Sequence, residues 1–289
     1  MYSDARSQSL SVGEALLRRW RELGPDVGVL VELGASEAER RPLIALNEHR
    51  VLEMGSVFKV FLLAAFARAV ERGEAIWEQP FRIAASDRLP HSAVLEDLPD
   101  GREISARDLL IAMMGQSDNT ATQMVIDWLP DGAVDDVIRA AGLESTVVDS
   151  DLRGLYARAE ADPGFEPNVC RTTAADMVRF YRFALWGGLL NDLLVSATFR
   201  DILESENRDQ GTTWTGLTCL RKSGYVAPPP LLGVGFVGAM LGGTEPLVFA
   251  FALNRHIDQA HGELLSAAFG PVIHDTLVWA IANAGALSR

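Results

Sequence analysis

The pattern of apolar and polar positions places strands near both ends of this chain and helices between them. Short apolar runs bounded by turn residues indicate strands at residues 27–33 and 42–46 and again after residue 218. Between these runs, apolar residues recur at the spacing of amphipathic helices. We therefore predict an α/β protein of the α+β type, in which strands from both chain ends form one antiparallel sheet with flanking helices.

The elements can be placed approximately. Strands are expected at 27–33, 42–46, 218–226, 233–241 and 246–253, and helices at 11–23, 56–72, 109–114, 120–128, 134–141, 173–183 and 262–284. Residues 10–55 and 200–289 would form the sheet subdomain and 56–199 an inserted all-helical subdomain, with the active site between them. Residues 147–171 are rich in Asp, Glu, Gly and Pro, and we predict a long, irregular acidic loop of functional importance there.

Residues 55–66 are apolar on nearly every side of a helix, which is typical of a buried central helix. Its first turn nevertheless carries Ser56 and Lys59, which lie on one helix face at this spacing. Burying both groups is costly unless they bond to each other or to a ligand. The pair therefore suggests a reactive site, although Ser56 could also serve only as a helix N-cap.

The use of lysine supports the reactive alternative. Of the 26 basic residues, only Lys59 and Lys222 are lysines, and the rest are arginines. Arginine does not give up its proton, whereas a lysine in a dry site can be neutral and act as a base. We infer that these two positions need an amine that arginine cannot replace.

Both lysines belong to short motifs that also contain a serine, and a third serine motif lies between them in the chain. The three motifs are Ser56-Val57-Phe58-Lys59, Ser117-Asp118-Asn119 and Lys222-Ser223-Gly224. Together they resemble the signature of the penicillin-recognising serine enzymes, the serine β-lactamases and penicillin-binding proteins. Their order and separations are similar to those of class A β-lactamases, and the resemblance covers about residues 10 to 285.

The resemblance implies a β-lactamase-like fold and a set of roles for acylation. Ser56 would be the nucleophile and Lys59 the base that takes its proton. Ser117 would relay a proton to the leaving group. The backbone N–H groups of Ser56 and of Tyr225 would form the oxyanion hole.

It also implies how a substrate would be held. Asn119 would bond to Lys59 and to the side-chain amide of the substrate. Lys222, Ser223 and Gly224 would form a substrate-binding segment that leads to Tyr225 of the oxyanion hole. Within it, Lys222 and Ser223 would bind a substrate carboxylate. The adjacent Asp118 would shape its turn rather than touch the substrate.

Deacylation is where the sequence departs from the family pattern. Class A enzymes activate the hydrolytic water with a Glu in the pattern Arg-x-Glu-x-x-x-Asn, which matches Glu160 here except that Gly164 replaces the Asn. Glu166 is a second candidate base, and a solvated loop carboxylate is the alternative for Glu160. We expect slower hydrolysis, or transfer of the acyl group to another acceptor.

The sequence thus predicts a serine hydrolase that opens a β-lactam or another small amide or ester through an acyl-enzyme on Ser56. A cytoplasmic esterase, amidase or acyltransferase of small-molecule secondary metabolism is an alternative. A penicillin-binding sensor without turnover, a binding protein rather than an enzyme, is another.

Composition limits the partners. A net charge of −13 argues against nucleic acid or an anionic membrane, and the five histidines show no paired metal-ligand spacing. We expect no metal or organic cofactor, and we favour a monomer that binds a small molecule carrying a carboxylate. No signal-peptide pattern is visible, which favours a cytoplasmic location, with a trimmed secreted form as the alternative.

Overall fold

The computed structural model describes residues 2–162, 164–209, 214, 216–226, 231–256 and 259–287. Its main element is an antiparallel sheet in the order β2-β1-β10-β9-β8. The strands are β1 (Val27–Leu33), β2 (Arg41–Leu46), β8 (Thr218–Val226), β9 (Leu231–Leu241) and β10 (Leu247–His256). Strands from the two chain ends therefore pair directly, as β1 with β10, and the predicted antiparallel sheet is confirmed.

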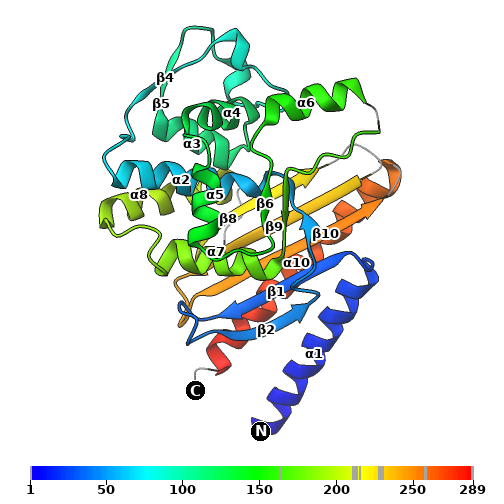
Figure 1. Cartoon of the computed structure of the whole chain (residues 1–289). Helices are drawn as coiled ribbons and strands as arrows, with labels where there is room; N and C mark the ends of the chain where they lie inside the picture. Colours follow the sequence, from blue (N-terminus) through cyan, green and yellow to red (C-terminus); the bar gives the residue numbers. More distant parts are fainter. Residues whose placement is uncertain are drawn as a thin grey trace.

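Helices cover both faces of this sheet (Figure 1). Because side chains alternate along a strand, Val29 and Val31 pack on one face and Leu30 on the other. The first face is covered by α1 (Tyr2–Glu22) and α10 (Gln259–Leu287), and the second by α7 (Ala174–Trp186). The sheet is thus the middle of three layers, with a separate apolar core on each side.

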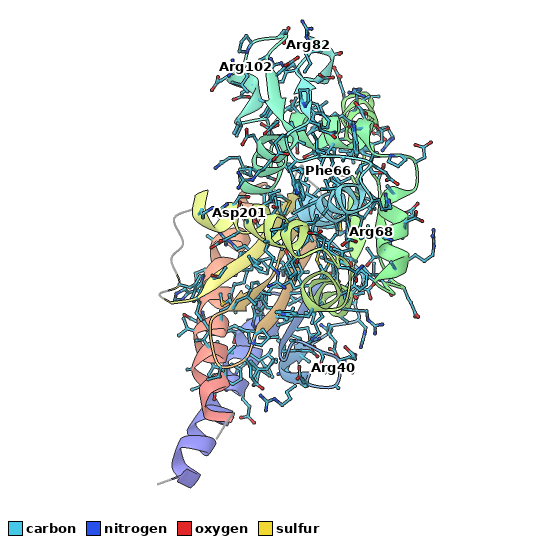
Figure 2. All side chains as sticks on the ribbon, turned by 90° about the vertical axis from the view of Figure 1, so that its left-hand side faces the viewer. Arg40, Phe66, Arg68, Arg82, Arg102 and Asp201 are labelled. Carbon is cyan, nitrogen blue, oxygen red and sulfur yellow. The ribbon has the colours of Figure 1, made fainter. Side chains whose placement is uncertain are left out.

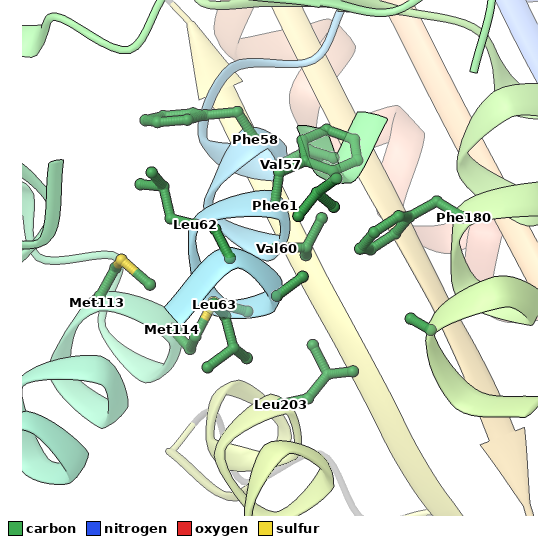
Figure 3. Packing of buried hydrophobic residues seen from close by; sticks show 14 of the residues in the cluster. Val57, Phe58, Val60, Phe61, Leu62, Leu63, Met113, Met114, Phe180 and Leu203 are labelled. Atoms are coloured by element: carbon green, nitrogen blue, oxygen red, sulfur yellow. The ribbon is translucent and has the colours of Figure 1, made fainter. Parts of the chain in front are cut away.

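The helical block is organised around α2 (Lys59–Glu71), which follows a 3-10 turn, η1 (Gly55–Phe58). Ten of its thirteen residues are buried, so the predicted central helix is confirmed. Figure 3 shows Phe61 of this helix facing Phe180 of α7, and the two ring centroids lie 4.6 Å apart. Around α2 lie α3 (Ala106–Gly115), α4 (Asn119–Trp128), α5 (Ala133–Ala140) and α8 (Leu193–Leu203).

The smaller elements complete the chain. They are β3 (Leu52–Glu53), β4 (Pro80–Arg82), η2 (Ala85–Asp87), η3 (Leu95–Asp97), β5 (Glu103–Ser105), β6 (Val147–Val148), β7 (Cys170–Thr172) and α9 (Ser205–Asp209). Strands β3, β7 and β6 form a second small sheet, and β4 pairs with β5. Viewed from the side, Arg82 and Arg102 mark the tip of the helical block, and α1 and α10 extend from the opposite end (Figure 2).

Two sequence predictions need correction. The first helix begins at Tyr2 rather than near residue 11. The segment 147–171 is not irregular throughout, because its middle folds into α6 (Leu152–Ala161). The Asp151 carboxylate caps this helix by accepting from the N–H of Gly154 at 2.9 Å, and Leu155 is buried beneath it. The acidic composition concealed this short apolar face.

Candidate active site

The 3-10 turn that carries Ser56 is fixed by buried polar contacts. The Glu53 carboxylate accepts from the N–H of Gly55 at 2.9 Å and from that of Cys170 at 2.9 Å. Gly55 has a φ of +54°, and a β-carbon there would lie 2.9 Å from the carbonyl oxygen of Tyr225. The turn therefore needs glycine both for its backbone conformation and for its close approach to β8.

Strand β8 approaches the same turn through Gly224. A β-carbon at Gly224 would lie 1.8 Å from the carbonyl oxygen of Met54 and 2.9 Å from the backbone nitrogen of Ser56. This close packing brings the half-buried Ser56 next to the strand segment that leads into Tyr225. An oxyanion hole made from the N–H groups of Ser56 and Tyr225 requires this proximity, and that role stays a prediction.

The amine of Lys59 lies at the centre of the site and is fully buried. Its Nζ is 2.6 Å from the carbonyl oxygen of Ser117, 3.0 Å from Ser117 Oγ and 2.8 Å from Asn119 Oδ1. The first two motifs found in the sequence therefore meet in space through this one nitrogen.

Burial lowers the pKa of Lys59 well below the ordinary lysine value of 10.5, and the positive charge of Lys222 lowers it further. The negative charges of Asp118 and Glu206 act in the opposite direction but are smaller effects. Desolvation favours the neutral amine, and a neutral amine has a lone pair that can accept a proton. The environment of Lys59 therefore suits a general base.

Asp118 lies in the turn between α3 and α4 and joins it to the start of η3. Its carboxylate caps α4 by accepting from the N–H of Ala121 at 2.8 Å, and it accepts from the N–H groups of Val94 at 3.0 Å and Leu95 at 2.9 Å. The side chain is completely buried. These contacts agree with the interpretation that Asp118 shapes the turn, which in turn places Ser117 beside Lys59.

Asn119 is held by protein groups on both sides of its amide. Besides accepting from Lys59, it donates from Nδ2 to the carbonyl oxygen of Pro90 at 3.1 Å and to the Tyr156 hydroxyl at 2.7 Å. Both Nδ2 hydrogens thus have partners. Burial raises the pKa of Tyr156, and its hydrogen bond from Asn119 offsets part of this effect, so the phenol is neutral at pH 7.

Sequence reasoning missed Tyr156, although a signal was available. Leu152, Leu155, Tyr156 and Ala159 follow the i, i+3, i+4, i+7 pattern of one helix face. All four line the cavity beside Ser56. Recognising α6 would have placed a tyrosine rather than Glu160 on the face towards the site.

A cavity of about 700 Å³ opens beside Ser56, between the helical block and strands β8 and β9. Its lining is mostly apolar, with polar groups at Ser56, His91, Gln116, Ser117, Asn119, Tyr156, Ser223 and Tyr225. In the described part of the chain, no lining residue is Asp, Glu, Lys or Arg. The described part of the cavity wall therefore has no carboxylate, lysine amine or guanidinium group, and His91 contributes an imidazole.

The two candidate deacylation bases lie elsewhere. Glu160 is exposed to solvent and does not line the cavity. Glu166 is also exposed, and its Oε1 lies 3.6 Å from Nδ1 of His256. The structure therefore does not bring either carboxylate to Ser56, because α6 turns its apolar face to the cavity and Glu160 outward.

The third motif lies at the same wall, but its lysine is set behind it. Ser223, Gly224 and Tyr225 line the cavity, whereas Lys222, like Lys59, is fully buried and does not. Lys222 Nζ lies 3.4 Å from Oε1 of Glu206, a residue of α9 that no sequence motif indicated. The expected binding of a substrate carboxylate by Lys222 is thus not what this arrangement provides directly.

The comparison with family models identifies the family. The model described as Beta-lactamase enzyme family matches residues 23–238, most of the chain. The chain belongs to this beta-lactamase enzyme family. Both the expected family and the expected fold, that of the beta-lactamases, are confirmed.

Solved beta-lactamase structures share the fold along nearly the whole chain. One from Sphaerobacter thermophilus DSM 20745 is 24% identical, with a TM-score of 0.73 and coverage of 92% of this chain and 96% of the other. One from Xanthomonas campestris pv. campestris is 25% identical, with a TM-score of 0.72 and coverage of 91% and 98%. The TLA-3 extended-spectrum beta-lactamase is 13% identical, with a TM-score of 0.77 and coverage of 94% and 99%. No curated protein matches the chain.

The described residues of this beta-lactamase family member include neither a metal-binding cluster nor a membrane-spanning helix. Within the described ranges, His, Cys, Asp and Glu side chains nowhere gather in threes that could hold a metal ion. Among the helices that the structure describes, none is both long and apolar enough to cross a membrane.

Proposed function

We propose that this protein is a serine hydrolase that opens a β-lactam or another small amide or ester through an acyl-enzyme on Ser56. The observation that carries the proposal is the buried Lys59 amine, whose lowered pKa and contacts with Ser117 and Asn119 suit a base one helical turn from Ser56. Membership of the beta-lactamase family supports a hydrolase of this kind.

The acylation step follows from these positions. Ser56 Oγ forms a bond to the substrate carbonyl carbon, and its proton passes to Lys59 Nζ. The carbonyl electron pair moves to oxygen, where the N–H groups of Ser56 and Tyr225 stabilise it. When the carbon–nitrogen or carbon–oxygen bond breaks, the leaving atom receives a proton through the Ser117 hydroxyl, and Lys59 returns to its neutral form.

The acyl-enzyme should be long-lived. Hydrolysis needs a base to activate water, and the cavity wall offers no carboxylate among the residues that the structure describes. Tyr156 places a neutral phenol where α6 meets Asn119. This favours, as a second candidate function, transfer of the acyl group to an acceptor other than water, or a stable adduct of the kind a sensor uses.

Intact-protein mass spectrometry after mixing with a penicillin, a chromogenic cephalosporin and a phenyl ester tests the proposal. A mass increase equal to the acyl group, absent in Ser56→Ala, is the expected result. Release of many products per enzyme would establish turnover, and a persistent adduct would favour transfer or trapping. Equal mass gain in wild type and Ser56→Ala, or none with any probe, would overturn the proposal.

A further inference from the structure

Glu206 reaches from α9 to the edge of β8 and takes both hydrogen-bond donors of Ser223. The backbone N–H of Ser223 donates to Glu206 Oε2 at 2.8 Å and to Oε1 at 3.1 Å. The Ser223 hydroxyl also donates to Oε1. Glu206 is only 1% exposed, so its carboxylate is fixed in this position by buried contacts.

The same carboxylate also faces Lys222. Glu206 Oε1 lies 3.4 Å from Lys222 Nζ, and the two side chains are 1% and 0% exposed. A buried cation and a buried anion at this distance balance each other's charge. Glu206 therefore offsets part of the positive charge of Lys222, and the Lys222 side chain does not line the cavity.

Nothing else on the cavity wall replaces that lost charge. Among the described lining residues there is no arginine or lysine, and His91 is the one residue with a basic side chain. A substrate carboxylate seated against Ser223 would meet a hydroxyl already bonded to Glu206, with the carboxylate of Glu206 directly behind it. Because the Ser223 hydroxyl proton is already donated to Glu206, a substrate carboxylate there would lose its water without gaining that hydrogen bond or a cation, which costs free energy.

We propose that Glu206 determines specificity by closing the carboxylate subsite, so that the acyl donor is an ester or amide with an uncharged group at that position. This inference rests on the proposed acylation of Ser56 and narrows its substrate class. It departs from the expectation that the substrate carries a carboxylate for Lys222 and Ser223. Glu206 acts through these two residues, and it makes no covalent contribution to the reaction.

Matched pairs of substrates test the proposal. One pair is the chromogenic cephalosporin and its methyl ester. The other is an aryl ester whose phenol leaving group carries a meta carboxylate, together with the same compound methylated at that carboxylate. For each compound, kcat/KM for acylation is divided by the rate constant of its alkaline hydrolysis, which corrects for intrinsic reactivity. In the wild type we expect this quotient to be at least tenfold higher for the methylated member of each pair that reacts.

Glu206→Gln keeps the size of the side chain and removes its charge, so it should shift this ratio at least tenfold towards the carboxylate member. Glu204→Gln is the matched control, because Glu204 lies two residues away and bonds to Arg208 instead, and the ratio should not change. A general loss of stability lowers both rates but leaves their ratio unchanged.

Two outcomes overturn the inference alone: acylation with a wild-type preference for the carboxylate members, or an unchanged ratio in folded Glu206→Gln. The wild-type ratio decides by itself where the variant does not fold. Absence of any Ser56 adduct with all four compounds overturns the proposed function as well, which separates the two failures.

Discussion

Lys59 donates to the backbone carbonyl oxygen of Ser117 at 2.6 Å, and Ser117 makes this possible with a φ of +56°. A non-glycine residue in this left-handed region is strained, and such residues persist only where their surroundings fix them. Here the next residue, the buried Asp118, is fixed because its carboxylate accepts from the N–H groups of Val94 and Ala121. The strained turn directs both the carbonyl oxygen and the hydroxyl of Ser117 towards one amine, which is the arrangement that the proposed proton transfer requires.

Replacing Lys59 with arginine should reduce acylation of Ser56 by at least about 100-fold although the positive charge is kept. The reason is that arginine stays protonated and cannot accept the proton of Ser56. Time-resolved intact-protein mass spectrometry measures the rate, with Ser56→Ala as the zero reference and thermal unfolding as a check on folding. Near-normal acylation in folded Lys59→Arg would contradict the mechanism.

The pH profile of acylation should rise with pH through the lowered pKa of Lys59, because only the neutral amine accepts a proton. Lys222→Met removes a positive charge that lowers this pKa, so the rise should move to higher pH. Glu206→Gln removes a negative charge that raises it, so the rise should move to lower pH. Stopped-flow acylation rates measure both shifts, and shifts in the same direction would show that Lys59 is not the titrating group.

A carboxylate placed on the cavity face of α6 should shorten the life of the acyl-enzyme. Tyr156→Glu puts one beside Asn119, where it can activate water, and deacylation should become about 100-fold faster. Glu160→Gln should leave the lifetime unchanged because Glu160 faces solvent. Decay of the adduct mass after removal of free substrate measures both. A longer-lived adduct in Glu160→Gln would restore Glu160 as the base.

Gly224→Ala should abolish acylation and destabilise the fold, because its β-carbon would lie 1.8 Å from the Met54 carbonyl oxygen and force β8 away from Ser56. Gly270→Ala is the control, since a β-carbon there meets nothing within 4 Å in the long helix α10. The gain in helix propensity is opposed by crowding of the new β-carbon against the ring of the following Pro271, so that change should alter stability by less than about 1 kcal/mol and leave acylation unchanged. Urea unfolding and adduct mass measure the two effects, and an active Gly224→Ala would refute the close packing of β8 against the turn.

The ion pair between Arg182 of α7 and Glu32 of β1 should be important for stability. Its atoms are 2.6 Å apart and the side chains are only 7% and 5% exposed. Arg182→Met leaves a buried carboxylate without its partner, which should cost about 3–5 kcal/mol. The exposed pair of Arg139 and Asp136 supplies the control, where Arg139→Met should cost less than about 1 kcal/mol. Chemical denaturation measures the free energy of unfolding of both variants. Equal decreases in the two would argue that burial does not determine how much an ion pair contributes to stability.

Much of the fold was predictable because local patterns agree with it. The strand at 27–33 alternates between two buried faces, and the helix after Ser56 is apolar all round, so each could be placed from its own residues. The middle of 147–171 could not, because Gly154 and several charged residues mask the apolar face of α6. That helix forms because its apolar face is buried against the cavity, and this contact comes from distant parts of the chain.

The same division holds for the candidate site. The sequence by itself determined the fold class, the family and the motifs that meet at Lys59, since these residue types at these spacings have few other uses. Only the tertiary structure decided that Tyr156 and not Glu160 faces the cavity, and that Glu206 faces Lys222. Both depend on how separate segments pack, because the charge that a group senses is set by neighbours in space and not by neighbours in the chain.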